Sequence, residues 1–331
     1  MSKKNDILVF CEVTKGEISV ISTEALGCGR SLADDLGVNV NAVIAGKSIN
    51  RLAADAIAYG ADKVFVVDNP LLQNYQTETF LSVFEKLSNE LTPDVIIMGQ
   101  TSIGRDMAPA LAARLDAAAT LDCVDLAVDS DTKQLHYTKP VYGGNAWAVY
   151  ATECKPHIAT IRAKAMQPIV RDENRSGETV SFDMEIDMDG IKTKLLEKVP
   201  EQVNGIRLED ARVVIGGGRG IGSIENFAKL EELAEMFKGA VGASRAVCDN
   251  GWLPSTMQIG LTGRVVTPEL YFAIGISGAS QHMAGCSGAT NIIAINNDDG
   301  ANIFREAHYG VLGDWQQVIA GFINKIKELN A

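Results

Sequence analysis

Short apolar runs and amphipathic stretches alternate through the first third of the chain. The apolar runs have the length of strands and lie at 7–13, 38–45, 64–67 and 95–98. The stretches between and after them predict helices at 24–36, 48–59, 77–91 and 103–115. Within 77–91, the residues Phe80, Phe84 and Leu91 belong to a set spaced to share one helix face. Strands without polar alternation, each followed by a helix, predict a parallel sheet covered on both sides.

The pattern changes after residue 118. Strand-like runs at 123–128, 135–138, 146–152 and 158–163 are joined by turns and show no helical periodicity. They predict antiparallel additions to the first sheet. A polar stretch follows at 166–200, with one further strand expected at 180–186. We place a junction near 190–205, which divides the chain into domains of 1–195 and 196–331.

The second half returns to alternating strands and helices. Strands are predicted at 211–215, 270–276 and 291–296, and a glycine-rich loop separates the first of them from a helix at 224–237. The final helix, at 315–329, has the clearest pattern, because Trp315, Ile319 and Ile323 belong to one apolar stripe. Such a stripe is typical of a helix packed on a core. Both halves of the chain are therefore predicted to be α/β.

Composition and charge exclude several classes of protein. The 331 residues are 46% hydrophobic and 22% charged, as in ordinary globular proteins. A formal net charge of -12 argues against a nucleic-acid binder or a protein of anionic membrane surfaces. None of the six cysteines has CxxC spacing, so we expect no iron–sulfur cluster and no structural zinc. Scattered thiols, with no signal peptide and no membrane-length apolar segment, indicate the reducing cytoplasm.

The first candidate for ligand binding is the glycine-rich loop at 216–223. It lies between a strand and a helix, where backbone amides and a helix N-terminus can bind phosphate. Gly218 and Gly220 fit the dinucleotide fingerprint, but Ser223 stands where a third glycine would be. The alternative is a tight turn between strand and helix. Arg219 within the loop favours an anion, since a turn alone does not need a cation.

Four more segments of the second half have side chains suited to a ligand. Ser244 and Arg245 end a further expected strand, and a loop with two glycines and a hydroxyl spans 258–264. Small residues and His282 follow the next strand, and 296–299 follows the last one. Each segment alone has a structural alternative, such as a solvated arginine, a core histidine or a turn. Together with the glycine-rich loop they make five such segments, four of them expected after strands, and these predict a site for an extended dinucleotide.

Elsewhere the residues that could carry chemistry are scattered. No nucleophile–base pair, metal cluster or carboxylate pair stands out, and His136, His157 and His308 are isolated and expected to be structural. The first half contains another strand-to-helix loop at 99–106. We favour a capped helix with an Arg–Asp pair there over a ligand site.

These motifs resemble those of electron transfer flavoprotein α subunits along nearly the whole chain. The most specific stretch runs from 258 to 295 and includes Thr262-Gly263, Pro268-Glu269-Leu270-Tyr271 and Gly275-Ile276-Ser277-Gly278-Ala279-Ser280-Gln281-His282. The Gly-Arg-Gly loop, the run at 241–245 and the segment at 309–314 match in order and spacing. In the N-terminal half the match includes Gly104-Arg105-Asp106, Lys139-Pro140 and Gly143-Gly144-Asn145.

The resemblance implies the fold and the partners. It implies an N-terminal parallel-sheet domain like those of nucleotide hydrolases, with antiparallel additions, and a C-terminal Rossmann-like domain that binds FAD. The N-terminal domain would pack against an electron transfer flavoprotein β subunit in a heterodimer. Such subunits relay single electrons between a dehydrogenase, of acyl-CoA dehydrogenase type, and an acceptor. Some relatives also bifurcate electrons from NADH with a second FAD in the β subunit.

The resemblance also implies which residues bind FAD. They are Arg219, Ser244, Arg245, Gln258, Ile259, Gly260, Leu261, Thr262, Ser277, Gly278, Ala279, Ser280, Gln281, His282, Asn296, Asp314 and Trp315. Thr262 and Arg245 would lie near the N5 and O4 edge of the flavin, and His282 near the N1 and O2 edge. Reduction places negative charge near N1 and O2, so a donor or cation at that edge stabilises the reduced flavin. Each ~1.4 kcal/mol by which the reduced form is stabilised over the oxidised form raises a one-electron potential by roughly 60 mV.

The chain departs from the usual family residues at four positions. Many members have glutamine where this chain has Leu261, and lysine where it has Arg264. They usually have a bulky aliphatic residue in place of Ser280, and leucine or tyrosine in place of Trp315. Leu261 removes a side-chain contact but leaves the backbone contacts. The chain has no N-terminal cluster-binding cysteines, which excludes the ferredoxin-fused variety.

Two other functions are alternatives to the electron carrier. A nucleotide-binding assembly or regulatory module without redox function would suit the topology of the first half. A NAD-dependent dehydrogenase ranks last, because the chain lacks an acid–base pair and an acidic ribose-binding residue at the expected distance after the glycine-rich loop.

Overall fold

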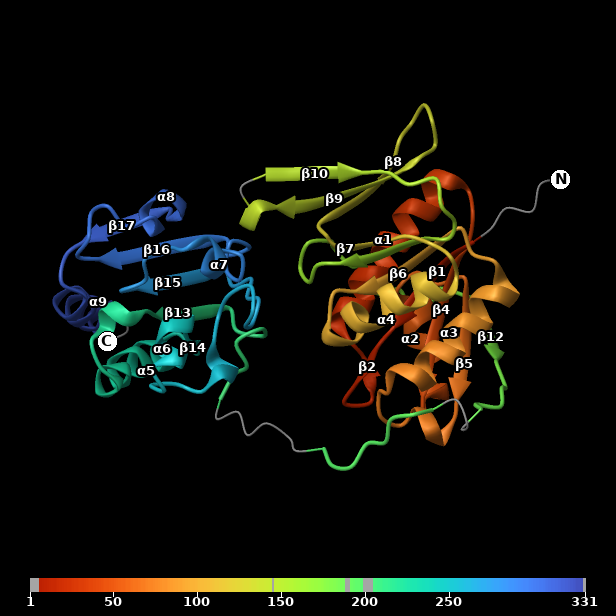
Figure 1. Cartoon of the computed structure of the whole chain (residues 1–331), viewed down its shortest axis with the longest axis horizontal. Helices are drawn as coiled ribbons and strands as arrows, with labels where there is room; N and C mark the ends of the chain where they lie inside the picture. The colour runs from red at the N-terminus through yellow and green to blue at the C-terminus, as the bar shows by residue number, and fades with distance from the viewer. Residues whose placement is uncertain (1–5, 145, 188–190, 199–204, 330–331) are drawn as a thin grey trace. The chain divides into compact units, whose positions relative to one another are not determined.

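The computed structural model describes residues 6–144, 146–187, 191–198 and 205–329, and the chain divides into two compact units (Figure 1). The first unit comprises Met1–Pro140 with Trp147–Lys198, and the second comprises Val141–Ala146 with Val199–Ala331. The junction expected near 190–205 includes residues 190 and 199–204, which lie outside the described residues. A domain boundary at residue 195 therefore stays a prediction.

A seven-stranded parallel sheet forms the centre of the first unit, in the order β12-β5-β4-β1-β6-β11-β7. Its strands are β1 (Ile7–Cys11), β4 (Val40–Gly46), β5 (Lys63–Asp68), β6 (Val95–Gly99), β7 (Ala119–Cys123), β11 (His157–Ile161) and β12 (Glu178–Ser181). The expected helices are α1 (Val20–Leu36), α2 (Ala53–Ala58), α3 (Thr77–Leu91) and α4 (Ser102–Arg114), and a small hairpin of β2 (Val13–Thr14) and β3 (Glu17–Ile18) precedes α1.

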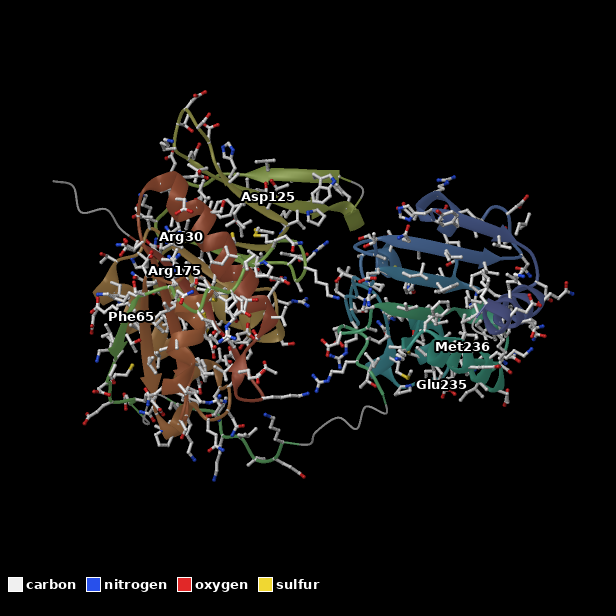
Figure 2. The ribbon with its side chains drawn as sticks, turned by 180° about the vertical axis from the view of Figure 1, so that it is seen from behind. Arg30, Phe65, Asp125, Arg175, Glu235 and Met236 are labelled. Carbon is white, nitrogen blue, oxygen red and sulfur yellow. The ribbon has the colours of Figure 1, made fainter. Side chains whose placement is uncertain are left out.

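Helices cover both faces of this sheet, which confirms the prediction from the apolar strands. Ile7 and Val9 of β1 lie in a core shared with α1 and α2. Leu8 and Phe10 lie in a second core shared with α3 and α4, to which Phe65 of β5 also belongs (Figure 2). Because both faces are buried, the strands need no alternation of polar and apolar residues.

The antiparallel strands are present, but they form a separate sheet. β8 (Asp125–Val128) and β9 (Leu135–Val141) pair antiparallel, and β10 (Ala146–Tyr150) lies next to β9. The expectation that the runs after residue 118 extend the first sheet antiparallel was wrong, since three of them form this separate sheet and the fourth, β11, joins the first sheet in parallel. β7, which also joins the first sheet in parallel, was not predicted. β11 is buried along its whole length between β6 and β7, which is the environment of an inner parallel strand.

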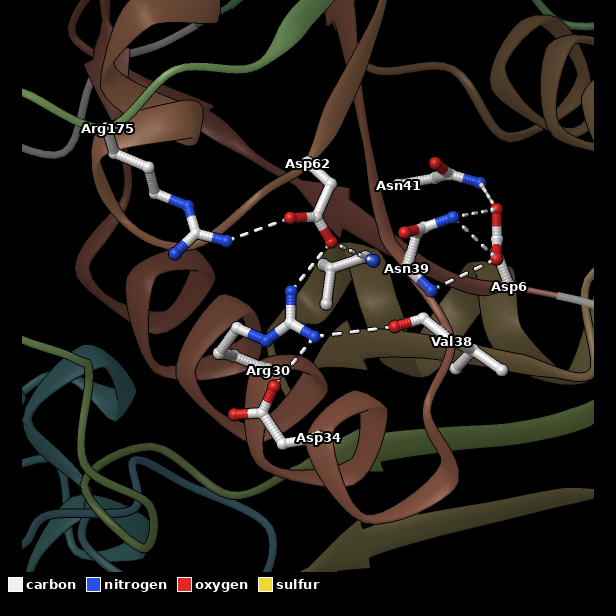
Figure 3. A network of polar contacts seen from close by, with 9 residues as sticks. Asp6, Arg30, Asp34, Val38, Asn39, Asn41, Asp62 and Arg175 are labelled. Atoms are coloured by element: carbon white, nitrogen blue, oxygen red, sulfur yellow. Dashed lines mark hydrogen bonds and ion pairs between the residues drawn. The ribbon is translucent and has the colours of Figure 1, made fainter.

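Polar contacts tie the amino ends of the strands in the first sheet to α1 (Figure 3). Asp62, just before β5, accepts hydrogen bonds from Arg30 at 2.6 Å and from Arg175 at 2.9 Å. It also accepts from the Val40 N–H at 2.9 Å. Burial opposes ionisation of Asp62, but these donors outweigh it and lower its pKa. The cluster lies at the edge opposite to the one where open α/β sheets bind ligands, so we assign it a structural role.

The second unit contains a five-stranded parallel sheet in the order β14-β13-β15-β16-β17. Its strands are β13 (Val213–Gly217), β14 (Ala240–Ala243), β15 (Leu270–Ile274), β16 (Asn291–Asn296) and β17 (Tyr309–Leu312). Its helices are α5 (Phe227–Met236), α6 (Arg245–Asp249), α7 (Ser280–Met283), α8 (Ile303–Glu306) and α9 (Trp315–Leu329). The strand at 291–296 and the helix at 315–329 are confirmed, whereas β17, which is short and contains a glycine, was not predicted.

This strand order places a topological switch point between β13 and β15. From β13 the chain proceeds to β14 on one side, and it then returns to β15 on the other side. Helices α5 and α9 share a core with Phe272 and Ile274 of β15, while α7 and α8 share a core with Tyr271 and Ala273. In open α/β sheets, ligands bind in the crevice outside the carboxyl ends of the strands at this point.

Candidate functional site

A cavity of about 750 Å³ lies at the switch point of the second sheet. It is lined by residues that follow β13, β14, β15 and β16, together with the loop at 258–262. Its volume is typical of pockets that bind cofactors and other small molecules. Segments far apart in the sequence therefore meet at one place, as expected for the carboxyl ends of parallel strands.

Most of the residues predicted to bind FAD line this cavity. They are Arg219, Ser244, Arg245, Gln258, Ile259, Gly260, Leu261, Thr262, Ser277, Ala279, Gln281, His282 and Asn296. Asn297 and Asp298, from the candidate segment at 296–299, line it as well. Gly220, from the candidate loop at 216–223, also lines the cavity, whereas Ala246, Gly275, Ile276 and Ala301 line it without having been predicted as site residues. These residues are small or apolar, and their only signal was a position close to a predicted site residue.

Four predicted residues lie outside the cavity lining. A Cβ at Gly278 would lie 2.2 Å from the backbone of α8, and φ there is +79°, so this glycine serves close packing. Ser280 is exposed at the first position of α7. Asp314 accepts from the Gln316 N–H at 2.7 Å and so caps α9, while Trp315 packs in the core. The core role expected for the stripe on α9 is confirmed, and flavin contacts at these four positions stay predictions.

The glycine-rich loop packs tightly against the neighbouring strand end. The N–H groups of Gly218 and Gly220 donate to the carbonyls of Ile274 and Gly275, at 2.8 and 3.1 Å. A Cβ at Gly218 would lie 2.1 Å from the Gly275 oxygen, so close approach requires glycine here. The chain continues as a 3₁₀ turn, Arg219–Ile221. The tight-turn alternative is therefore confirmed for these two glycines, whose amides are already used within the unit.

Two arginines give one side of the cavity a positive charge. Arg219 follows β13, and Arg245 follows β14 at the start of α6. The Nε of Arg245 lies 3.2 Å from Asp249 Oδ2, and both side chains are well exposed. An exposed pair of this kind contributes little, so Arg245 can exchange its partner for an anion in the cavity. Among the lining residues Asp298 is the one carboxylate, and it accepts from the Gly300 N–H at 3.0 Å.

Hydrogen bonds on both sides hold the loop at 258–264. The Ile259 N–H donates to the last residue of β14 at 2.8 Å, and the Leu261 N–H donates to a carbonyl of α7 at 2.7 Å. Gln258 Nε2 donates to Thr262 Oγ1 at 2.9 Å. Leu261 is 61% exposed as a residue, so the backbone hydrogen bonds are what fix this loop in the cavity wall.

His282 is a buried polar residue of the cavity wall. Its Nε2 lies 2.8 Å from the hydroxyl of Tyr271, while Nδ1 is buried and has no hydrogen-bond partner in the described chain. Burial lowers the pKa of His282 to about 4, against a smaller opposite effect of the Ile259 backbone, so the ring is neutral near pH 7. A buried polar atom without a partner is costly. A polar ligand in the cavity would remove this cost.

The candidate loop of the first unit is a helix cap. Thr101 precedes α4, and its Oγ1 accepts from the Gly104 N–H at 3.0 Å, which confirms the capped-helix interpretation. Asp106 accepts from the Tyr75 hydroxyl at 2.7 Å instead of forming the expected Arg–Asp pair.

In the second unit, His308 Nδ1 accepts from a backbone N–H of β16 at 3.0 Å, which confirms a structural role.

A ligand cavity at the switch point of a parallel sheet defines a nucleotide-cofactor-binding class of α/β protein. Comparison with known proteins narrows this class. A family model described as electron transfer flavoprotein domain matches residues 7–186, and one described as electron transfer flavoprotein FAD-binding domain matches residues 207–287.

Three curated relatives are similar over nearly the whole chain. The electron transfer flavoprotein subunit alpha of Thermoanaerobacterium thermosaccharolyticum is 44% identical over 330 residues, covering 99% of this chain and 100% of the relative. The subunit of the same name from Bacillus subtilis is 38% identical over 330 residues, 100% of this chain and 99% of the relative. Protein FixB of Clostridium saccharobutylicum is 38% identical over 324 residues, 98% of this chain and 96% of the relative.

The chain belongs to the electron transfer flavoprotein α-subunit family. Its role is in electron transfer, its cofactor is FAD, and the family implies a β subunit as partner. The resemblance that the sequence motifs suggested is thereby confirmed, as is the two-domain α/β fold.

Proposed function

We propose that the cavity of the second unit is the FAD site and that the chain carries electrons as one half of a heterodimer. The observation that carries this proposal is the meeting of Arg219, Arg245 and the buried, unpartnered Nδ1 of His282 around one cavity at the switch point. Cations and a polar ring atom in the wall suit a ligand that is both anionic and aromatic.

The residues of the cavity fit this cofactor in different ways. Arg219 and Arg245 would balance the negative charge of the cofactor. Ser244, Thr262 and Asn296 offer hydroxyl and amide groups for orientation. When bound, FAD supplies the acceptance and release of electrons, and the protein supplies its position and electrostatic surroundings.

The partners of the complex belong to the same proposal. We propose that residues 1–195 form the domain that packs against the β subunit, and that residues 196–331 form the flavin domain. Electrons would pass from a dehydrogenase of acyl-CoA dehydrogenase type to a further acceptor, with electron bifurcation from NADH as an additional activity. The net charge of -12 supports brief docking to partners with basic surfaces.

The compartment proposed for this complex is the cytoplasm. All six cysteines are free thiols, as is typical of reducing compartments. In the part of the chain that the structure describes, no helix is long and apolar enough to cross a bilayer.

Co-purification of the chain with its β subunit tests the proposal. We expect a yellow complex with flavin absorbance that releases FAD when it is denatured. Reduction is then measured with NADH and, separately, with a reduced acyl-CoA dehydrogenase, which distinguishes the two electron sources. A colourless complex with bound nucleotide would contradict the proposal and favour the assembly or regulatory module.

A further inference from the structure

Tyr271 lies behind the wall of the cavity and contacts it through His282. It is the second residue of β15 and is completely buried. Its hydroxyl lies 2.8 Å from His282 Nε2 and occupies space that the neighbouring strand leaves free, since a Cβ at Gly216 would lie 2.1 Å from it. The phenol is therefore held in one place by backbone on one side and by the histidine on the other.

The surroundings indicate which of the two groups donates. Burial and the nearby Cys286 raise the pKa of Tyr271, so its hydroxyl keeps its proton. Cys286 Sγ donates weakly to the His282 carbonyl at 3.6 Å. A thiol sulfur is a poor acceptor, whereas an unprotonated imidazole nitrogen is a good one. The hydroxyl proton of Tyr271 therefore goes to His282 Nε2.

This direction decides where the ring carries its own proton. A neutral imidazole has one N–H, so a ring that accepts at Nε2 carries its hydrogen on Nδ1. The Ile259 backbone lies near the ring and raises the pKa of His282, so a ligand would compete with it for the ring N–H. Nδ1 has no hydrogen-bond partner of good geometry in the described chain, so its N–H is available to a ligand.

We propose that Tyr271 is a positioning residue that holds His282 in the Nδ1–H tautomer, so that the cavity wall offers a hydrogen-bond donor and not a lone pair. The identity of the ligand that receives this bond rests on the proposed function, whereas the tautomer itself does not. A reduced flavin carries more negative charge on its ring than an oxidised one, so a donor binds it more tightly. Tyr271 would thus act on the cofactor through His282 without touching it.

The effect of Tyr271→Phe follows from this argument. The variant keeps the ring volume but removes the hydrogen bond to Nε2, so the Nδ1–H tautomer loses its support. We expect the preference for reduced over oxidised flavin to fall about tenfold, which lowers a one-electron midpoint potential by about 59 mV.

The test uses ¹⁵N-histidine labelling of the full chain, both free of cofactor and in the complex with the β subunit. The sequence has four histidines, so His282→Gln assigns the signals of this ring. Wild type should show a pyrrole-like Nδ1 and a pyridine-like Nε2 at His282. In Tyr271→Phe the Nδ1–H signal should weaken, and the flavin potential should fall.

The first unit offers a matched control, Tyr137→Phe. Tyr137 is also completely buried beside a histidine, with its ring centroid 6.1 Å from that of His157, the same separation as in the Tyr271–His282 pair. Its hydroxyl has no hydrogen-bond partner in the described chain, so this variant removes a buried phenol without removing such a bond. It should change neither the His282 spectrum nor the potential.

The outcomes separate this inference from the proposed function. An Nε2–H ring in cofactor-free wild type would overturn the inference, as would an unchanged His282 spectrum in a folded Tyr271→Phe. If that variant does not fold, the wild-type spectrum alone decides. A chain that shows the Nδ1–H ring but binds no FAD would instead overturn the proposed function.

Discussion

The two parallel sheets of this chain differ at their switch points, since side chains close the first and a cavity lies at the second. In the first sheet the switch point lies between β1 and β6, and Glu12 spans it by accepting from Thr101 Oγ1 at 2.6 Å. In the second, the crevice between β13 and β15 opens to a cavity whose wall holds the unpartnered Nδ1 of His282. One kind of topology therefore gives a closed edge where the polar group is satisfied internally, and an open cavity, the proposed FAD site, where it is not.

Packing reinforces the closure of the first edge. Glu12 is 6% exposed, and a Cβ at Gly99 would lie 2.6 Å from the Ile21 side chain. Such close packing leaves the crevice to the protein's own side chains. This closure argues against a nucleotide-binding module in the first half, because a nucleotide at this switch point would have to displace the Glu12–Thr101 hydrogen bond.

The largest effect is expected from Gly218→Ala, which breaks the open edge. The new Cβ would lie 2.1 Å from a backbone oxygen that cannot move aside like a side chain. We expect the free energy of unfolding of the second unit to fall by about 4 kcal/mol, with loss of FAD. Denaturant unfolding and FAD content measure this.

Gly321→Ala is the matched control for that substitution. Gly321 lies in α9, and a Cβ there meets nothing within 4 Å. Alanine should stabilise the helix by roughly 0.5–1 kcal/mol and leave FAD binding unchanged. If both variants lost stability equally, close packing of the loop would not be the reason that Gly218 is needed.

A smaller effect is expected from Glu12→Gln at the closed edge. Burial raises the pKa of Glu12 to about 7 from an ordinary value of 4.5, although the Thr101 hydrogen bond opposes this. Because the folded pKa is the higher one, the unfolded chain ionises first, and stability falls as the pH rises from about 4.5 to 7. The loss is about 3 kcal/mol.

Glutamine keeps the hydrogen bond and does not ionise, so Glu12→Gln should stabilise the first unit at pH 8 and change little at pH 4.5. Thermal unfolding across this pH range measures the difference. Glu90→Gln, at an exposed position of α3, is the control and should have no such profile. A wild type whose stability is flat between pH 4.5 and 7 would contradict the burial of an ionisable group at this switch point.

The smallest effect is expected from Arg245→Ala, which removes one cation from the cavity wall of the second unit. A charge-assisted hydrogen bond to a ligand is worth about 1.5 kcal/mol or more, so FAD should bind about tenfold more weakly or its potential should fall. FAD titration and potentiometry measure both. Arg212→Ala is the control, since Arg212 pairs with Glu269 away from the cavity. Equal results for the two arginines would remove Arg245 from the site.

Periodicity and strand-end logic predicted much of this molecule from the sequence. The helices at 77–91 and 315–329 have the predicted bounds, because their apolar stripes coincide with real cores. The convergence of Arg219, Ser244 and His282 also followed from their positions after parallel strands. Both are consequences of local pattern plus one general rule of topology.

The parts that could not be predicted depend on contacts between distant segments. In the sequence, β11 has the same pattern as the other short strands after residue 118. Its parallel pairing is set by β6 and β7 on either side of it in the sheet. Tyr271, within an apolar strand, reads as core, and its bond to His282 is visible only in three dimensions. The amides of Gly218 and Gly220 likewise gain their partners from the end of β15 and the residue after it, which are distant in the sequence.

The fit of the Tyr271 hydroxyl into the space above Gly216 has a consequence for how this family can change over generations. Any side chain gained at position 216 would displace the phenol of Tyr271. If a smaller residue replaced Tyr271, the steric constraint that requires glycine at 216 would be lost. Descendants of this chain are therefore expected to retain both residues or to exchange them together, so positions 216 and 271 should covary.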